Sequence, residues 1–219
     1  MMKIFIIGAT GMTGSSLVKE AVKAGYKVIA NARNNANLLA LKEEFPTIEI
    51  LNKDAFELTL EDIADSEVII DAFATAPEQA FLHVDLAAKL VAMLRNSSVR
   101  IGFILGAGSL LVGKENNVHH AYDDIVKDQS TVSWRAIPEN QLYELDFLKN
   151  VKNVDWFGVS PGLNFISGEK SDNIIYGIDH LLFNNNGISE TTSGTMASAV
   201  ISEISDKKHS MERFTVING

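Results

Sequence analysis

The chain has 219 residues, of which 46% are hydrophobic and 8% aromatic, so it is long and apolar enough to bury one substantial core. Its 28 acidic and 19 basic residues give a net charge of −9, which disfavours binding to nucleic acid and to anionic membranes. The sequence contains no cysteine, which excludes disulfides, thiolate nucleophiles and cysteine metal sites.

The sequence has no pattern typical of a membrane span or an export signal. No apolar run reaches the roughly 18 residues that span a bilayer. The apolar stretch before Gly8 is too short for a signal peptide. The sequence also has no internal repeats or obvious linkers. We therefore expect a cytoplasmic protein that forms one domain over residues 1–219, as a monomer or dimer, with neither nucleic acid nor membrane as a partner.

A glycine-rich turn follows the first predicted strand. The apolar run at residues 3–7 leads into glycines at every third position, and apolar residues then recur at helical spacing as far as Gly25. Glycine lets a ligand approach the backbone, and the amides at a helix N-terminus favour an anion. The stretch predicts a pyrophosphate site, with a tight turn that binds no ligand as the alternative. Its candidate residues are Gly8, Thr10, Gly11, Met12, Thr13 and Gly14.

The second and third predicted strands, residues 26–30 and 47–51, flank a predicted helix at 37–44. NAD sites place an acidic residue about 20 positions past the glycines, whereas NADP sites place a basic one there. Here no Asp or Glu lies between Glu20 and Glu43, and Arg33 follows the second strand. Arg33 therefore favours NADPH, because a guanidinium can pair in two-pronged fashion with the 2′-phosphate of that cofactor. The alternative is that Arg33 is an exposed loop arginine that binds no ligand.

The carboxyl ends of the third and fourth strands supply further candidates. Asp54 follows the third strand, where it would face the ligand crevice and contact adenine; a helix cap is an equally good interpretation. After a short helix at 60–64, the fourth strand at 68–74 contains Ala72, Phe73 and Ala74, and its small residues would let the backbone approach the cofactor. His83 lies on the long amphipathic helix at 78–94, where a single histidine is usually structural.

The second half of the chain supplies the expected reaction site. The fifth strand, residues 99–105, ends at Gly106, which begins the expected floor of that site. Residues 111–140 are polar and lack a firm period, so we expect a loop and helical excursion over the site. Residues 160–219 should also cover it. Beyond residue 140 we expect a helix at 141–149, strands at 154–159 and 214–217, and a loop with Pro161 at 160–165.

Strands that alternate with helices predict an α/β fold, a Rossmann-type doubly wound sheet that is mostly parallel with helices on both faces. The motifs Gly8-x-x-Gly11-x-x-Gly14, Ala32-Arg33-Asn34, Gly106-Ala107-Gly108-Ser109-Leu110 and Ser160-Pro161-Gly162 resemble those of the atypical and extended short-chain dehydrogenases/reductases. Within that superfamily the chain is similar to the NAD(P)H-binding proteins related to NmrA and to the biliverdin-IXβ and NADH-flavin reductases. The resemblance covers essentially the whole chain and also implies that Asp54 contacts adenine.

The sequence lacks several common catalytic arrangements. No tyrosine is followed four residues later by the lysine that would lower the pKa of its phenol, and Ser109 lacks a Gly-x-Ser-x-Gly elbow. The five histidines are scattered, so we expect no metal site. Hydride transfer to a flavin or quinone needs little more than correct placement, since solvent can supply the proton. Ser109 is the first candidate for a polar group aimed at substrate, with a helix cap as its alternative, and Tyr122 is the second.

Two functional hypotheses lead. The first is an NAD(P)H-dependent oxidoreductase, with NADPH preferred, that reduces a flavin, quinone or similar planar acceptor bound as substrate. The second is a non-catalytic redox sensor resembling NmrA, which binds the dinucleotide and a protein partner. A third, a sugar-nucleotide enzyme of the extended branch, is disfavoured by the missing tyrosine–lysine pair and the short C-terminal part.

Overall fold

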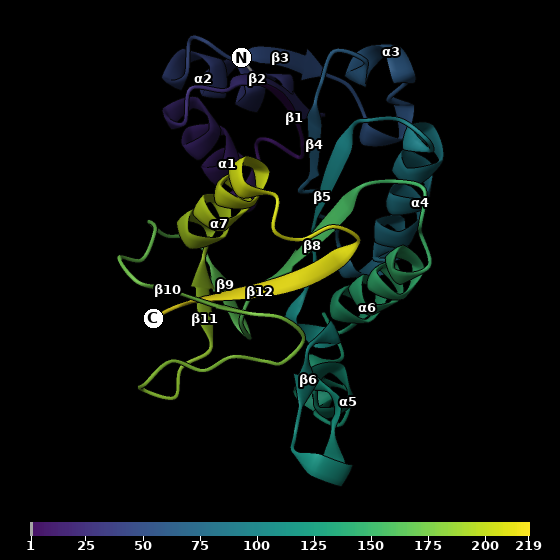
Figure 1. The fold of residues 1–219 in the computed structure, drawn as a ribbon, viewed down its shortest axis with the longest axis vertical. Helices are drawn as coiled ribbons and strands as arrows, with labels where there is room; N and C mark the ends of the chain where they lie inside the picture. The colour runs from purple at the N-terminus through teal and green to yellow at the C-terminus, as the bar shows by residue number, and fades with distance from the viewer. Residues whose placement is uncertain (1) are drawn as a thin grey trace.

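The computed structural model describes residues 2–219, which build an eight-stranded sheet in the order β10-β12-β8-β5-β4-β1-β2-β3 (Figure 1). All neighbouring strands run parallel except β10, which pairs antiparallel with β12 at one edge. The strands are β1 (Lys3–Ile7), β2 (Lys27–Ala32), β3 (Glu49–Asn52), β4 (Val68–Asp71), β5 (Arg100–Ile104), β8 (Trp156–Ser160), β10 (Ile174–Gly177) and β12 (Glu212–Asn218). The expected mostly parallel Rossmann-type fold is confirmed.

Helices cover both faces of this sheet. They are α1 (Met12–Lys23), α2 (Asn35–Glu44), α3 (Leu60–Ile63), α4 (Leu82–Leu94), α5 (Ala121–Ile125), α6 (Ala136–Lys149) and α7 (Ser193–Asp206). The structure also contains two separate two-stranded sheets. One pairs β6 (Leu111–Val112) with β7 (His119–His120), and the other pairs β9 (Asn164–Ile166) with β11 (Glu190–Thr192). Figure 1 shows α1 and α7 together on one side of the sheet and α4 and α6 on the other.

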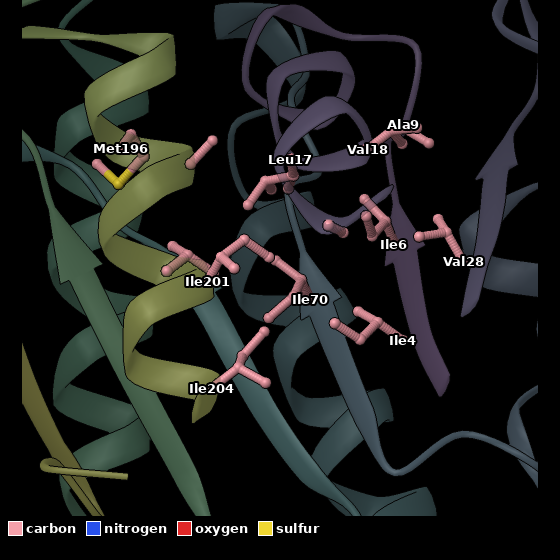
Figure 2. Packing of buried hydrophobic residues seen from close by; sticks show 14 of the residues in the cluster. Ile4, Ile6, Ala9, Leu17, Val18, Val28, Ile70, Met196, Ile201 and Ile204 are labelled. Atoms are coloured by element: carbon pink, nitrogen blue, oxygen red, sulfur yellow. The ribbon is translucent and has the colours of Figure 1, made fainter. Parts of the chain in front are cut away.

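The alternation of side chains along β1 divides the core into two layers. Ile4 and Ile6 point into the layer beneath α1, α2 and α7, whereas Phe5 and Ile7 point into the layer beneath α4 and α6. Figure 2 shows the first layer, where Leu17 of α1 and Ile201 of α7 lie over the sheet. Because both faces are covered, the central strands are mainly apolar, as buried parallel strands usually are, with polar residues such as Asp71 and Arg100 at their ends.

The strand order reverses between β1 and β4. The chain builds β1, β2 and β3 outward in one direction, then returns to place β4 on the other side of β1 and continues with β5. Ligands of open α/β sheets bind at the carboxyl ends of the strands that flank such a switch point. The fold therefore directs attention to the turn after β1 and the segment after β4.

At the opposite end of the sheet, a buried ion pair attaches α7. Arg100 at the start of β5 donates from Nη2 to Glu203 Oε1 at 2.6 Å and from Nη1 to the Glu203 backbone oxygen at 2.9 Å. The guanidinium lies 4.4 Å from the centre of the Phe157 ring, and His209 donates its N–H to the same carboxylate at 3.0 Å. Both charged side chains are almost completely buried, so Glu203 is the buried counter-charge of Arg100; the part-exposed Asp155 lies 3.6 Å from Arg100 Nε as a second one.

Most expected elements are present, with shifts at their ends. Helix α6 begins at Ala136, five residues before the predicted start at 141, because Pro138 is accommodated in its first turn. The predicted helix at 78–94 is confirmed over Leu82–Leu94 and is preceded by a 3₁₀ turn at Pro77–Gln79. Helix α7 and the short strands β9, β10 and β11 were not expected. Within residues 2–219 no helix is both long and apolar enough to cross a bilayer.

We predict that Glu203→Ala lowers the free energy of unfolding by about 3–5 kcal/mol, because it removes the buried carboxylate that accepts from the Arg100 guanidinium and leaves only the part-exposed Asp155, 3.6 Å from Arg100 Nε. Asp206→Ala is the matched control, since Asp206 contacts Lys208 at 3.3 Å in an exposed pair whose loss should cost about 0–1 kcal/mol. Urea unfolding of both variants measures the difference. Equal small losses would contradict the importance of the buried pair.

Candidate functional site

The turn after β1 contains glycines with different tasks. Gly8 has φ +72°, and a Cβ added to it would lie 2.5 Å from the backbone oxygen of Ala72. A Cβ on Gly14 would lie 2.1 Å from the backbone oxygen of Gly8. These two positions therefore require glycine for the close packing of α1 against the ends of β1 and β4.

Gly11 differs from both. A Cβ there would meet one protein atom, the Gly8 oxygen at 3.3 Å, so this face of the turn is open. Gly11 is the N-cap residue of α1, where it supplies no side-chain cap, and the first turn of the helix contains no acidic residue. The amides of the first turn lack helical partners and carry the positive end of the helix dipole. The open turn can therefore hold an anion.

A smaller cavity of ≈ 220 Å³ lies on one side of this turn, at the ends of β1, β2 and β3. Its lining includes Gly8, Thr10, Arg33 and Asp54. The Arg33 side chain is 70% exposed and lies 3.8 Å from Asp54 Oδ2, while Asp54 Oδ1 accepts from the backbone N–H of Phe56 at 2.8 Å. Asp54 thus caps a 3₁₀ turn and also lines the cavity, so its two sequence interpretations are compatible.

Side chains behind this cavity fix the position of Arg33. Asn52 donates from Nδ2 to the Arg33 backbone oxygen at 2.8 Å, and Asn31 donates from Nδ2 to the backbone oxygens of Leu51 and Lys53. Lys53 also lines the cavity, but its ammonium is held by Asp62 at 2.7 Å. Arg33 is therefore the basic side chain in this lining that is better placed to turn toward an anionic ligand.

A larger cavity of ≈ 490 Å³ lies on the other side of the turn, and its lining is mainly apolar. The walls come from the segments after β4, β5 and β8 and from the first turns of α6. The polar side chains in the lining are those of Thr13, Thr75, His83 and Gln141, and Trp134 adds its indole. Aromatic rings of Phe73, Trp134 and Phe165 surround a space of the size that small organic ligands occupy.

The glycines after β5 allow α6 to form one wall of this cavity. A Cβ on Gly106 would lie 2.2 Å from Gln141 Oε1, and a Cβ on Gly108 would lie 2.8 Å from Pro138 Cβ. The start of α6 therefore packs directly on the turn at Ala107–Ser109. This contact brings Gln141 and Ile137 to the cavity floor formed by Leu105 and Gly106.

The two cavities form one groove across the glycine turn, because both are lined by Gly11, Ala72, Phe73 and Ala74. The groove thus has a polar end with the exposed Arg33, a central turn whose backbone amides can hold an anion, and a larger apolar end. These features match the three parts of a nicotinamide dinucleotide, namely a phosphorylated or free ribose with adenine, a pyrophosphate and a nicotinamide ring.

Three buried ionisable groups lie beside the larger cavity. Burial raises the pKa of Asp71 to about 7. The hydrogen bond that Asp71 Oδ1 accepts from the Phe73 N–H at 3.0 Å acts in the opposite direction and lowers this pKa. Burial raises the pKa of Glu144 well above its ordinary value, and the negative charge of Asp71 adds to this effect. Burial lowers the pKa of His83 to about 4, so its imidazole is neutral at neutral pH.

Most of the residues singled out in the sequence lie along the groove. The lining of one or both cavities includes Gly8, Thr10, Gly11, Met12, Thr13, Arg33, Asp54, Ala72, Phe73, Ala74, Gly106 and Pro161. Gly14 lies behind the turn and acts through packing. The binding roles of these residues remain predictions.

The two candidate catalytic residues lie elsewhere. Ser109 is 1% exposed and outside the cavity lining; its hydroxyl donates to the Gly106 backbone oxygen at 3.2 Å and accepts from Arg213 Nη1 at 3.2 Å. Tyr122 also lies outside the lining, and burial, with a further contribution from Glu139, raises the pKa of its phenol. In this geometry the Ser109 hydroxyl is engaged by protein groups away from the cavity lining, and the pKa of Tyr122 is shifted in the direction opposite to that of an activated acid–base tyrosine.

Sequence reasoning missed several residues of the larger cavity. Gln141, Phe165 and Leu163 had no local motif that distinguished them, and His83 was interpreted as structural. One signal for Gln141 was available. Because Pro138 is acceptable in a first helical turn, the sequence allowed α6 to begin before residue 141, which places Gln141 inside the helix that forms the cavity wall. Among the described residues, no cluster of three or more His, Asp and Glu side chains is placed to hold a metal ion.

Comparison with known proteins adds independent information. A family model described as NAD(P)H-binding matches residues 8–207. The Bacillus subtilis protein YwnB is 34% identical over 221 residues, which cover 99% of each chain. A crystal structure from Lactobacillus casei has a TM-score of 0.88 at 32% identity, and one from Streptococcus pneumoniae, provisionally named an NADH-flavin reductase, has a TM-score of 0.88 at 28% identity. Both structures match over 100% of each chain.

We predict that Gly11→Val abolishes dinucleotide binding while the circular dichroism spectrum stays near that of the wild type. The valine side chain would fill the open turn, and Gly11 already has the extended φ and ψ of −79° and 175° that valine favours. Gly14→Val is the contrasting variant and should fail to fold normally, since its Cβ would overlap Gly8. Unchanged affinity of Gly11→Val in a calorimetric titration would refute the site.

Proposed function

The chain belongs to the NAD(P)H-binding family, and on that premise we propose that it is a reductase that transfers a hydride from NADPH to a planar acceptor such as a flavin or quinone. The observation that carries this proposal is the apolar cavity that adjoins the glycine turn. The provisional name of the Streptococcus pneumoniae relative, NADH-flavin reductase, agrees with it.

In this proposal the groove holds the dinucleotide from end to end. Adenosine occupies the smaller cavity beside Arg33 and Asp54, and the pyrophosphate rests on the amides from Thr10 to Thr13 at the start of α1. The nicotinamide enters the larger cavity beside Gly106 and Pro161. The bound reduced nicotinamide supplies a hydride, so the chain must hold an acceptor against it and exclude water.

The lining of the larger cavity favours a planar, weakly polar acceptor. Phe73, Trp134 and Phe165 offer ring faces and edges for stacking, and no Asp, Glu, Lys or Arg belongs to the lining within the described chain. A sugar nucleotide would bring a second pyrophosphate and many hydroxyl groups, which this lining would leave without partners. The cavity therefore supports the flavin or quinone class over the sugar-nucleotide alternative.

Turnover separates the reductase from a non-catalytic sensor resembling NmrA. We predict steady-state oxidation of NADPH, followed by its absorbance, when purified protein is given a panel of free flavins and quinones. The variant Gly11→Val, which should not bind the cofactor, is the matched control for background reaction. NADPH binding without turnover of any acceptor would reject the reductase and leave the sensor.

Arg33 supports a preference for NADPH over NADH. Its pairing with a 2′-phosphate would contribute about 1.5–3 kcal/mol, which is roughly one to two orders of magnitude in affinity. Asp54 would then exchange its contact with Arg33 for one with the adenine edge. NADH has no 2′-phosphate, so its binding gains nothing from this charge.

We predict that Arg33→Ala erases most of this preference by weakening the binding of NADPH alone. Arg95→Ala is the control, since Arg95 is exposed at the C-terminal end of α4, away from the groove, and its loss removes the same charge. Fluorescence titration of wild type and both variants with each cofactor measures the six affinities. If wild type binds NADPH and NADH equally, or Arg33→Ala weakens both by the same factor, the assignment of NADPH is wrong.

A further inference from the structure

The larger cavity is lined by uncharged polar side chains that have no partner in the protein. Gln141 of α6 and Thr75, in the segment after β4, both line it and are partly exposed. Neither side chain forms a hydrogen bond with residues 2–219, and neither has a completely enclosed polar atom left unpaired. An amide and a hydroxyl can each donate and accept hydrogen bonds. These two groups are therefore available to the polar atoms of a ligand in the cavity.

Gln141 lies at the floor of this cavity, beside the position proposed for the nicotinamide. A Cβ built on Gly106 would lie 2.2 Å from Gln141 Oε1 and 3.1 Å from its Cδ, so the carboxamide rests directly on the Gly106 backbone. Trp134 lines the same cavity with a side chain that is 44% exposed. A flat ligand that rests beside Gly106 therefore meets a neutral amide together with an aromatic ring.

The cationic side chains around this end of the groove are held by other protein groups. No Lys or Arg belongs to the lining within residues 2–219. Arg213, which donates to the Ser109 hydroxyl, is 5% exposed and is paired with Asp179 at 2.7 Å. Arg135, at the start of α6, donates from Nη1 to the backbone oxygen of Val126 at 3.1 Å. The cavity thus presents no lysine or arginine to a negatively charged ligand.

The surroundings are instead acidic. Asp71 directly precedes the lining residue Ala72, and Glu144 lies one helical turn beyond Gln141; both carboxyl groups are buried. In the proposed complex the pyrophosphate adds further negative charge at Gly11, which also lines this cavity. An anionic group placed here would lose its hydration and gain no counter-charge. Neutral ligands are therefore favoured over anionic ones.

We propose that the larger cavity takes an uncharged, carbonyl-bearing ring compound as the acceptor and that Gln141 binds one of its carbonyl oxygens. This inference rests on the reductase function proposed above and narrows its substrate class. The hydride from NADPH carries two electrons and solvent supplies one proton, so a quinone becomes a hydroquinone and NADPH becomes NADP⁺. The Gln141 amide donates to the oxygen on which negative charge accumulates during the transfer. Phosphate, sulfonate or carboxylate groups on an acceptor stay outside the cavity or prevent its binding.

Two quinones that differ by one charged group test this selection. 1,2-Naphthoquinone is neutral, whereas 1,2-naphthoquinone-4-sulfonate is an anion whose electron-withdrawing sulfonate makes its ring the better hydride acceptor in solution. Wild type should still reduce the neutral quinone with a kcat/KM at least about 10-fold higher, once each value is divided by the uncatalysed rate with NADPH. Equal corrected values would overturn the proposal.

A cation at the rim of the cavity should weaken or reverse the selection. Leu163 lines the cavity and is 52% exposed, so Leu163→Lys places an ammonium group at the entrance. The ratio of kcat/KM for the sulfonate to that for the neutral quinone should rise by about 10-fold. Leu60→Lys adds the same charge at an exposed position of α3 outside both cavities and should leave the ratio unchanged. No rise in Leu163→Lys, or an equal rise in both variants, would contradict the proposal.

The role of Gln141 has its own test. Gln141→Leu removes the amide and should lower kcat/KM for 1,2-naphthoquinone by about 10-fold, the usual effect of one lost hydrogen bond, with the affinity for NADPH unchanged. Wild-type kcat/KM would overturn this role. An equal fall in NADPH affinity would assign the amide to the cofactor and would overturn it as well.

A binding measurement without turnover separates this inference from the function on which it rests. The NADP⁺ complex has no hydride to give, and of the two tryptophans Trp134 lines the cavity whereas Trp156 is 1% exposed. Quenching of tryptophan fluorescence should show tighter binding of 1,2-naphthoquinone than of its sulfonate, with Trp134→Phe as the correction for light absorbed by the quinone. Selective binding without oxidation of NADPH would reject the reductase and support the neutral-ligand cavity. Equally efficient turnover of both quinones would reject this inference alone.

Discussion

The approach of α1 to the end of β1 is the contact on which the candidate site depends. With no side chain at Gly14, the helix begins against the backbone of Gly8, and Gly8 in turn lies against Ala72 at the end of β4. The N-terminus of α1 is thereby fixed at the point where the strand order reverses. The start of α1 borders the part of the groove that both cavities share, so a single packing constraint positions the anion site that we propose.

The rest of the groove is built by contacts between distant segments. Gly106 and Gly108 admit the first turn of α6, which closes one wall of the larger cavity, and the pairing of β9 with β11 brings Phe165 to another. Arg213 of β12 joins Ser109, Ser160 and Asp179 through its guanidinium, and so fixes the loops that follow β5 and β8. The apolar walls of the larger cavity are therefore a property of this assembly of segments rather than of any one motif.

The sequence was sufficient for the parts that local pattern determines. The apolar runs at β1, β4, β5 and β8, the glycine turn and Arg33 are each visible in a few adjacent residues. Helix α7 was missed because serine, glycine and β-branched residues lower its helix propensity, although Met196, Val200 and Ile204 recur every fourth residue. The sequence could not show that the Ser109 hydroxyl is buried and accepts a hydrogen bond from Arg213, because Arg213 lies 104 positions away in the chain.

A crystal structure of the protein with bound NADP⁺ would test the central claim most directly, that one dinucleotide lies across the glycine turn. The account predicts the 2′-phosphate beside the Arg33 guanidinium, the pyrophosphate on the amides from Thr10 to Thr13, and the nicotinamide in the apolar cavity beside Gly106. A cofactor bound in the reverse orientation, or with its nicotinamide outside the apolar cavity, would contradict it.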